Sequence, residues 1–272
     1  MNKLIKLLSL CLILIFITAL AAGCSQQSTA GVEQKILKVG VTAGPHAEIM
    51  DVVKKIAEKD GLPIEIVEFN DYIQPNVALS QGDIDVNSFQ HKPYLDNVIK
   101  DRNYDIVSVA NTVIFPMGIY SNKLKNTADL QTGAIVAIPN DPTNGARALL
   151  LLEKSGLITL KSGAGLKAAV TDIVSNPKKI IIKELDAAQI PRSLADMDAA
   201  AINTNYALTA GLVPAKDTIA IEDINSPYAN IIAVRSKDKE NPAVQKLIKA
   251  YHSDEVKAFI AEHFKGSVTA AW

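Results

Sequence analysis

Short strand-like runs alternate with helical runs along most of this chain, and this alternation limits the possible fold more than any other feature. The first example joins an apolar run at 36–41 to an amphipathic stretch at 47–59, which ends before Gly61, and then to a second apolar run at 64–69. Strands separated by helices favour a sheet with helices on its faces. The sequence therefore predicts an α/β fold and not a sandwich or a helical bundle.

The alternation continues in two further series. Runs at 77–80, 84–89 and 93–100 extend the first series. The second series begins after Ser121, and we expect it to form a second lobe. Its expected elements are strands at 135–138, 180–184 and 199–202 and helices at 144–154 and 205–210, and the chain closes with a strand at 231–234 and two helices within 242–264.

The N-terminus predicts a lipoprotein signal peptide at 1–23. Two lysines give a positive flank, residues 7–22 form an apolar run, and the small residue Gly23 precedes Cys24. The run is shorter than the roughly 20 residues that span a bilayer, so a retained transmembrane anchor is the weaker alternative. We expect cleavage before Cys24, a lipid such as palmitate on that residue, and a flexible polar tether at 24–34.

Cysteine content and net charge set further limits. The chain has two cysteines, Cys11 and Cys24, and a formal net charge of −1. Cys11 would leave with the signal peptide and Cys24 would carry lipid, so the mature chain would have no disulfide and its core must hold the fold. The nearly balanced charge gives no basic surface for nucleic acid, and we expect no nucleic-acid partner.

One segment, FNDYIQPNVALSQGDIDVNSFQHKPYL at 69–95, gathers aromatic, amide and imidazole groups where a simple core element needs mostly aliphatic residues. Four further segments are VGVTAGPHAEIM at 39–50, PNDPTNGARALLLLEKSGL at 139–157, INTNYAL at 202–208 and SPYANIIAV at 226–234. Together they resemble the NlpA/MetQ-like methionine-binding lipoproteins, the extracytoplasmic receptors of methionine ABC importers. The resemblance covers essentially the whole mature chain and implies transport, not catalysis.

The resemblance also implies a fold, a ligand and partners. The fold is a two-lobed periplasmic-binding-protein fold, type II-like, with a ligand cleft between the lobes. Lobe 1 would comprise 35–117 and 231–272, and lobe 2 would comprise 118–230. The implied ligand is methionine, L or D, and the implied partners are a membrane permease and a cytoplasmic ATPase. The protein would be anchored to the cell membrane through lipid on Cys24 and would face the extracytoplasmic side.

A methionine zwitterion presents a carboxylate, an ammonium group and a thioether tail. For the carboxylate we expect Arg147, with Asn144 and Gly145 in the same first turn of a helix, because a guanidinium fork and unpaired backbone N–H groups can converge on an anion there. The residues alone fit a surface arginine at a capped helix start about equally well. The resemblance favours the ligand-binding role.

For the ammonium group we expect neutral amide oxygens, because a buried carboxylate would itself have to lose its water. The candidates are Asn203, Asn205 and Asn230. By residue type alone, Asn203 and Asn205 are more often turn and cap residues than ligands. The family pattern places binding asparagines at Asn205 and Asn230, so Asn203 ranks lowest of the three.

For the thioether tail we expect Tyr72, Phe89, His91 and Tyr94, which match family positions that form an aromatic pocket. Sulfur packs favourably at aromatic edges, and such a wall would favour methionine over aliphatic side chains of similar size. Taken singly, Phe89 is more readily a core residue and the tyrosines half-exposed loop residues. The four together within one motif favour a pocket.

The motif Gly44-Pro45-His46 follows the first expected strand. It matches the opening motif of the family. We expect it to shape the turn at this point, without direct contact with a ligand.

The histidines raise a metal receptor as an alternative. A site from His46, His91 and Glu48 is geometrically possible but lacks an HxxxH or HExxH pattern. His252 and His263 lie eleven residues apart, roughly 16 Å along a helix, which is too far for one ion. We expect no metal and no cofactor. The chain also lacks a GxSxG motif and, once processed, a thiol nucleophile, so we expect no enzyme.

The residue types leave other functions open. A receptor for a methionine-containing dipeptide or another apolar amino acid would need the same groups, and enantiomers differ only in how groups are placed around one carbon. A surface adhesin-type lipoprotein is the alternative from a different class. Affinity, envelope type and oligomeric state are likewise not set by the sequence.

Overall fold

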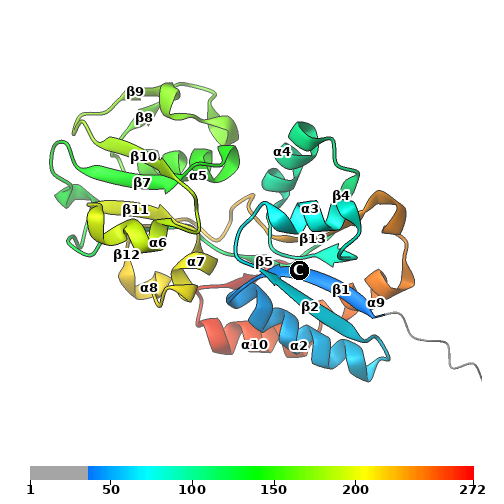
Figure 1. Ribbon diagram of the computed structural model, residues 1–272. Coiled ribbons are helices and arrows are strands. Elements are labelled where there is room, and N and C mark those ends of the chain that lie inside the picture. Colours follow the sequence, from blue (N-terminus) through cyan, green and yellow to red (C-terminus); the bar gives the residue numbers. More distant parts are fainter. Residues whose placement is uncertain (1–35) are drawn as a thin grey trace, which may run out of the picture. The chain divides into compact units, whose positions relative to one another are not determined.

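Residues 36–272 are the part of the chain that the structure, a computed structural model, describes (Figure 1). The expected signal peptide at 1–23, the lipidation site Cys24 and the expected tether at 24–34 lie outside the described residues. Within residues 36–272, no helix is both long enough and apolar enough to cross a membrane.

The first sheet has five strands in the order β2-β1-β3-β13-β4. They are β1 (Leu37–Thr42), β2 (Ile64–Phe69), β3 (Val86–Asn87), β4 (Ile106–Asn111) and β13 (Ile231–Arg235). β1 pairs in parallel with β2 and β3, whereas β13 runs antiparallel to β3 and β4. All residues of β1 except Lys38 are buried, as expected for an inner strand that is covered on both faces.

Helices cover both faces of this sheet. They are α2 (Pro45–Lys59), α3 (Gln74–Gln81), α4 (Lys92–Arg102), α9 (Pro242–Tyr251) and α10 (Asp254–Phe264). The alternation along β13 separates the faces, because successive side chains of a strand point to opposite sides. Ile232 and Val234 join the core formed with α2, α9 and α10, whereas Ile231 and Ala233 join the core formed with α3 and α4.

The second sheet also has five strands, in the order β10-β7-β11-β6-β12. They are β6 (Gly118–Tyr120), β7 (Ile135–Pro139), β10 (Ile181–Leu185), β11 (Ala199–Ile202) and β12 (Thr218–Ile221), and the helices beside them are α5 (Pro142–Lys154), α6 (Ile190–Ser193), α7 (Thr204–Thr209) and α8 (Pro214–Asp217). The alternating alanines of β11 again separate two cores. Ala199 and Ala201 pack with α5, and Ala200 packs with α6 and α7.

Shorter elements complete the described chain. The strands β5 (Val113–Ile114) and β14 (Thr269–Ala270) pair with each other, as do β8 (Thr159–Leu160) and β9 (Ile173–Ser175). Single 3₁₀ turns are η1 (Thr127–Asp129), η2 (Gly165–Lys167), η3 (Val170–Asp172), η4 (Leu194–Asp196) and η5 (Ser236–Asp238).

Two segments connect the sheets, one between β4 and β6 and one between β12 and β13 (Figure 1). They lie side by side. The Thr112 N–H donates to the carbonyl of Asn230 at 2.8 Å, and the Asn230 N–H donates to the carbonyl of Val113 at 2.7 Å. Neighbouring crossings of this kind bring the loops of both sheets together at one place.

The structure confirms the α/β fold and its two lobes, each built around one sheet. The runs at 77–80, 84–89 and 93–100 correspond to α3, β3 and α4. The strand expected at 84–89 is shorter in the structure. β3 comprises Val86–Asn87, and the N–H groups of Asp85 and Ser88 also donate to the carbonyls of Lys38 and Gly40 on β1. The strands β4 and β12 were not predicted. The residue limits of the lobes stay a prediction.

Candidate ligand-binding site

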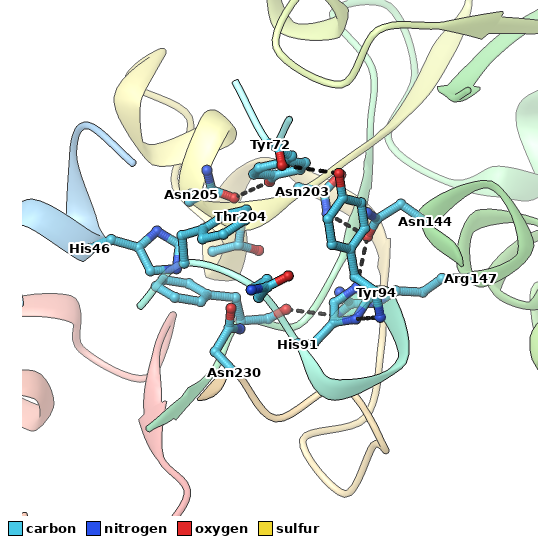
Figure 2. A pocket seen from close by; sticks show the side chains of 13 residues that line it. His46, Tyr72, His91, Tyr94, Asn144, Arg147, Asn203, Thr204, Asn205 and Asn230 are labelled. Carbon is cyan, nitrogen blue, oxygen red and sulfur yellow. Dashed lines mark hydrogen bonds between the residues drawn. The ribbon is translucent and has the colours of Figure 1, made fainter. Parts of the chain in front are cut away.

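A buried cavity lies between the two sheets, where the loops that follow their strands meet (Figure 2). The space at the site is about 340 Å³, counting the part that is open to solvent. Most of the lining side chains are buried. A ligand bound here would be surrounded by protein and largely removed from water.

All eight residues that we expected to bind the ligand line this cavity. The set is Tyr72, Phe89, His91, Tyr94, Asn144, Arg147, Asn205 and Asn230. Asn203, ranked lowest among the asparagines, lines it as well, and so does His46, for which we expected no ligand contact. The structure thus brings together residues from five separate segments of the sequence. Whether each contacts a ligand stays a prediction.

One side of the cavity is an aromatic wall formed by Tyr72, Phe89 and Tyr94. The ring of Tyr72 lies 6.0 Å from the rings of both Phe89 and Tyr94, and the last two are 6.3 Å apart. The Tyr94 hydroxyl donates to the Tyr72 carbonyl at 3.0 Å, which ties the loop before α3 to α4. Tyr206, on α7 of the second sheet, packs against Tyr72 from outside at 4.8 Å.

The start of α4 orients His91. His91 is the N-cap of α4, and its Nδ1 accepts the N–H of Tyr94 at 3.1 Å. Because Nδ1 accepts, the ring proton of the neutral imidazole sits on Nε2, which donates to Oδ1 of Asn144 at 3.1 Å. Burial, together with the charge of Arg147, lowers the pKa of His91 to about 3. His91 is therefore uncharged at neutral pH.

His46 is a second neutral histidine of the lining. Its ring packs against Phe115 with 4.7 Å between centroids, and its Nδ1 lies 2.7 Å from the hydroxyl oxygen of Thr42. Burial lowers the pKa of His46 to about 4. The histidine follows Gly44, whose positive φ of 81° and close approach to Thr209 leave no room for a side chain, so the turn after β1 requires glycine.

Arg147 comes from the second turn of α5 and already has a carboxylate partner. Its Nε and Nη2 donate to Glu222 at 2.7 and 2.5 Å, and Nη2 also donates to the carbonyl of Phe115 at 2.7 Å. The ring of Tyr228 stacks on the guanidinium, with 4.3 Å from Cζ to its centroid. The side chains of Arg147 and Glu222 are only 3% and 11% exposed.

This arrangement corrects one expectation about Arg147. A guanidinium has five N–H donors, of which Nε and both hydrogens of Nη2 are engaged by Glu222 and Phe115. The expected fork is therefore occupied by Glu222. Among the described residues, no hydrogen bond engages Nη1, which leaves this nitrogen for an anionic ligand group.

Asparagine side chains form the rest of the polar lining. Oδ1 of Asn144 accepts from Nδ2 of Asn203 at 2.8 Å as well as from His91, and Oδ1 of Asn205 accepts from the Tyr72 hydroxyl at 2.6 Å. Within residues 36–272, the buried polar atoms without a hydrogen-bond partner include Nε2 of His46 in the lining and two asparagine atoms, Oδ1 of Asn203 and Nδ2 of Asn205. Buried polar atoms are normally satisfied, so this acceptor and this donor call for a ligand with both kinds of group.

Several of these contacts join the two sides of the cleft. Tyr72 and His91 belong to loops of the first sheet, and their partners Asn205 and Asn144 belong to α7 and α5 beside the second sheet. The cavity is thus closed by hydrogen bonds between the lobes. Groups of three or more histidine, cysteine, aspartate or glutamate residues placed to hold a metal ion are not found within residues 36–272.

Comparison with known proteins assigns this chain to a family. The family model of the NlpA lipoproteins matches residues 37–272. The chain belongs to the NlpA lipoprotein family. D-methionine-binding lipoprotein MetQ of Escherichia coli (strain K12) is 49% identical over 253 residues, 92% of each chain. Outer membrane lipoprotein 3 of Mannheimia haemolytica is 49% identical over 237 residues, 87% of this chain and 90% of that protein.

Solved structures agree with this assignment. A nutrient-binding protein from Burkholderia cenocepacia, bound to methionine, is 58% identical with a TM-score of 0.86 and matches 87% of this NlpA lipoprotein and 100% of its own chain. A periplasmic substrate-binding protein of an ABC transporter from Coxiella burnetii is 49% identical, with a TM-score of 0.84 over 87% of this chain and 100% of its own. The resemblance inferred from the five segments is confirmed, and the family is one of substrate-binding proteins, not of enzymes.

Several residues of the site in this NlpA lipoprotein were missed from the sequence. They are Gln90, Phe115 and Thr204, which line the cavity, and Glu222 and Tyr228, which hold Arg147. Gln90, Thr204 and Tyr228 lie inside the segments that carry the family resemblance, so their positions could have indicated a role in the site. The sequence around Glu222 does not indicate a role in the site, because the arginine that it binds is 75 positions away.

Gln90 belongs to a buried amide network behind the aromatic wall. Its Nε2 donates to Oδ1 of Asn76 at 2.8 Å and to Oδ1 of Asn87 at 3.0 Å, and its Oε1 accepts from Asn76 at 2.8 Å. All three side chains are buried. A fully satisfied network of this kind makes the loop that carries Phe89 and His91 rigid.

Proposed function

We propose that this NlpA lipoprotein binds free methionine in the cavity between its lobes and delivers it to an ABC importer. The observation that carries the proposal is that the cavity combines an arginine and several amide side chains with an aromatic wall. A zwitterionic amino acid with a thin apolar tail can bind both kinds of group. The names of the relatives, several of them D-methionine-binding lipoproteins, support the same ligand.

The carboxylate of methionine would bind Nη1 of Arg147, with Nδ2 of Asn205 as a second donor. The ammonium group would bind amide oxygens, and the unpartnered Oδ1 of Asn203 makes this residue a stronger candidate than the sequence suggested. Asn230 lines the cavity nearby and is the other candidate. Oδ1 of Asn203 and Nδ2 of Asn205 would each gain a partner, which favours binding because buried polar atoms are costly when left unpaired.

The tail of methionine would lie along Tyr72, Phe89 and Tyr94. Sulfur at an aromatic edge adds about 0.3 to 1.5 kcal/mol beyond burial of the apolar carbon atoms. Closure would stabilise the bound state because the ligand contacts residues of both lobes.

Delivery requires partners outside the chain. We propose that lipid on Cys24 holds the protein at the extracytoplasmic face of the membrane and that a permease with a cytoplasmic ATPase receives the ligand. The action would consist of capture and release, without catalysis. Membership of the NlpA lipoprotein family and similarity to ABC-transporter binding proteins support this arrangement.

A thermal-shift screen tests the proposal. The protein, freed of bound ligand by unfolding and refolding, is measured with all amino acids in both enantiomers and with short methionine peptides. A ligand at a hundred times its Kd adds about 2.7 kcal/mol to the free energy of unfolding. We expect a clear rise in Tm with one or both methionine enantiomers. A folded sample that responds to none of these ligands would overturn the proposal, and a response to a peptide alone would replace its ligand.

A further inference from the structure

Glu222 is a buried charge that lies directly behind Arg147 of the cavity lining. It follows β12 and does not itself line the cavity. One of its oxygens accepts from Nε of Arg147 at 2.7 Å, and the other accepts from Nη2 at 2.5 Å and from the backbone N–H of Met117 at 2.8 Å. The carboxylate is thus fixed at both oxygens, between the arginine and the segment that crosses from the first sheet to the second.

The other groups around Arg147 carry little charge. His46 and His91 are buried and neutral at neutral pH. Tyrosine is neutral at this pH, and burial raises the pKa of Tyr72, Tyr94 and Tyr228 further, that of Tyr228 to about 12.

Asp141 is a further charge close to the cavity. It caps the first turn of α5 by accepting the N–H and Nδ2 of Asn144, both at 2.9 Å. A carboxylate in this position is offset by the positive end of the helix dipole. Asp71, Asp186 and Arg102 also act electrostatically on the lining residue Tyr94. Arg147 and Glu222 are the pair of opposite charges in direct contact at the binding end.

We propose that Glu222 cancels the charge of Arg147 and thereby makes the site selective for ligands with no net charge. This inference rests on the proposed function. A zwitterion brings one positive and one negative group into the cavity, so a change in the background charge affects them in opposite directions and the two effects largely cancel. A ligand with a single charge has no such compensation, and at a separation of a few ångströms in a protein the effect is large.

Glu222 would be a positioning residue in addition, because it holds Arg147 with Nη1 toward the cavity. Loss of positioning and loss of charge balance have different signatures. Misplacing Arg147 weakens every ligand that has a carboxylate and leaves other ligands unaffected. Removing the negative charge strengthens anions and weakens cations.

The test compares three ligands by titration calorimetry on the whole protein and on the Glu222→Gln variant. They are methionine, its 2-hydroxy analogue, which lacks the ammonium group and is an anion, and methioninol, which lacks the carboxylate and is a cation. Relative to methionine, we expect the substitution to improve binding of the anion by on the order of tenfold and to weaken binding of the cation by a similar factor.

Two variants serve as controls. Glu222→Asp keeps the charge with a shorter side chain, and we expect the order of the three ligands to match the parent. Glu65→Gln removes a glutamate on β2 that pairs with Lys38 at 4.0 Å and is 50% exposed, and we expect no change. Melting curves with and without ligand show whether each variant is folded.

The outcomes separate the two proposals. If the parent binds none of the three ligands, the proposed function fails. If the parent binds methionine and Glu222→Gln shifts anion and cation in the same direction, or shifts neither, only the charge-balance inference is overturned. Should Glu222→Gln not fold, the parent still provides a test, because a parent that binds the anion as tightly as methionine has no selectivity for neutral ligands and contradicts the inference.

Discussion

The two sides of the cavity are built on different principles. The side from the first sheet is an aromatic wall with two neutral histidines, packed on a satisfied amide network. The side from the second sheet carries a fixed ion pair and two unpartnered amide atoms. The first side supplies shape and an apolar surface, and the second supplies charge and hydrogen bonds. We therefore expect substitutions on the second side to change affinity for the charged groups of the ligand, and substitutions on the first side to change selectivity for its tail.

Among the substitutions considered, removing Arg147 on the second side should weaken methionine binding the most. Arg147→Ala takes away the expected carboxylate partner and leaves Glu222 buried and unpaired. We expect a loss of about 2 to 5 kcal/mol of methionine binding, at least about 30-fold in Kd by calorimetry. We also expect the free energy of unfolding to fall by about 3 to 5 kcal/mol in denaturant titrations.

A double variant separates these two effects. Arg147→Ala with Glu222→Gln removes the unpaired charge, and we expect it to recover much of the stability without recovering binding. If Arg147→Ala binds methionine within a few-fold of the parent, the carboxylate assignment is wrong.

Acid should act on the first side, where the buried histidines lie. His46 and His91 have pKa values of about 4 and about 3 when folded and near 6.5 when unfolded. Below pH 6.5 the unfolded state therefore binds protons that the folded state does not, so stability falls as pH falls from 6.5 toward 4 and is constant with respect to these groups above 6.5. Each histidine contributes up to about 1.4 kcal/mol per pH unit in this window.

Urea titrations between pH 5 and 8 measure the slope. We expect it to be shallower in His91→Gln than in the parent. If the slope in His91→Gln equals that of the parent, the pKa of His91 is not lowered in the folded state.

The unpartnered amide atoms give a smaller, local effect on the second side. Asn203→Ala removes the free acceptor Oδ1 and the hydrogen bond that Nδ2 donates to Asn144. We expect methionine to bind about 1 to 3 kcal/mol more weakly, roughly 5- to 150-fold in Kd. Asn176→Ala, which removes hydrogen bonds to the backbone of Ile180 in the second lobe, is the matched control. Equal Kd values for Asn203→Ala and the control would show that Asn203 does not bind the ligand.

Changing the aromatic wall should have the smallest effect on affinity and the clearest effect on selectivity. Phe89→Leu keeps an apolar side chain but removes one aromatic edge. We expect methionine to lose about 0.3 to 1.5 kcal/mol and norleucine, which has a methylene in place of sulfur, to lose less. Competition titrations with both ligands measure the ratio of Kd values. A ratio unchanged by the substitution would show that the wall does not recognise sulfur.

Much of the fold was predictable because the alternation of apolar periods is a local property. The helix at 47–59 and the strand at 64–69 were found close to their observed limits, as α2 and β2. β3 was overestimated because apolar content does not reveal how many residues pair in a sheet. Residues 88–91 keep backbone hydrogen bonds to β1 and β13, while the side chains of Phe89 and His91 line the cavity and so depend on tertiary contacts.

The candidate site was predictable where its residues cluster in short segments and not where they depend on distant partners. Tyr72, Phe89 and Tyr94 stood together in one unusual segment. Glu222 carried no signal, because the reason for its presence is a buried arginine 75 positions away. The same distance explains why the guanidinium fork was assigned to the ligand when a glutamate occupies it.

We expect methionine to bind with its charged groups at the second side and its tail at the first. A crystal structure of this protein with methionine would reveal this orientation. Ligand density should lie in the cavity, with the carboxylate on Nη1 of Arg147, the ammonium group on amide oxygens, and the sulfur against Tyr72, Phe89 and Tyr94. Density in the reverse orientation, or an empty cavity at saturating methionine, would contradict this expectation.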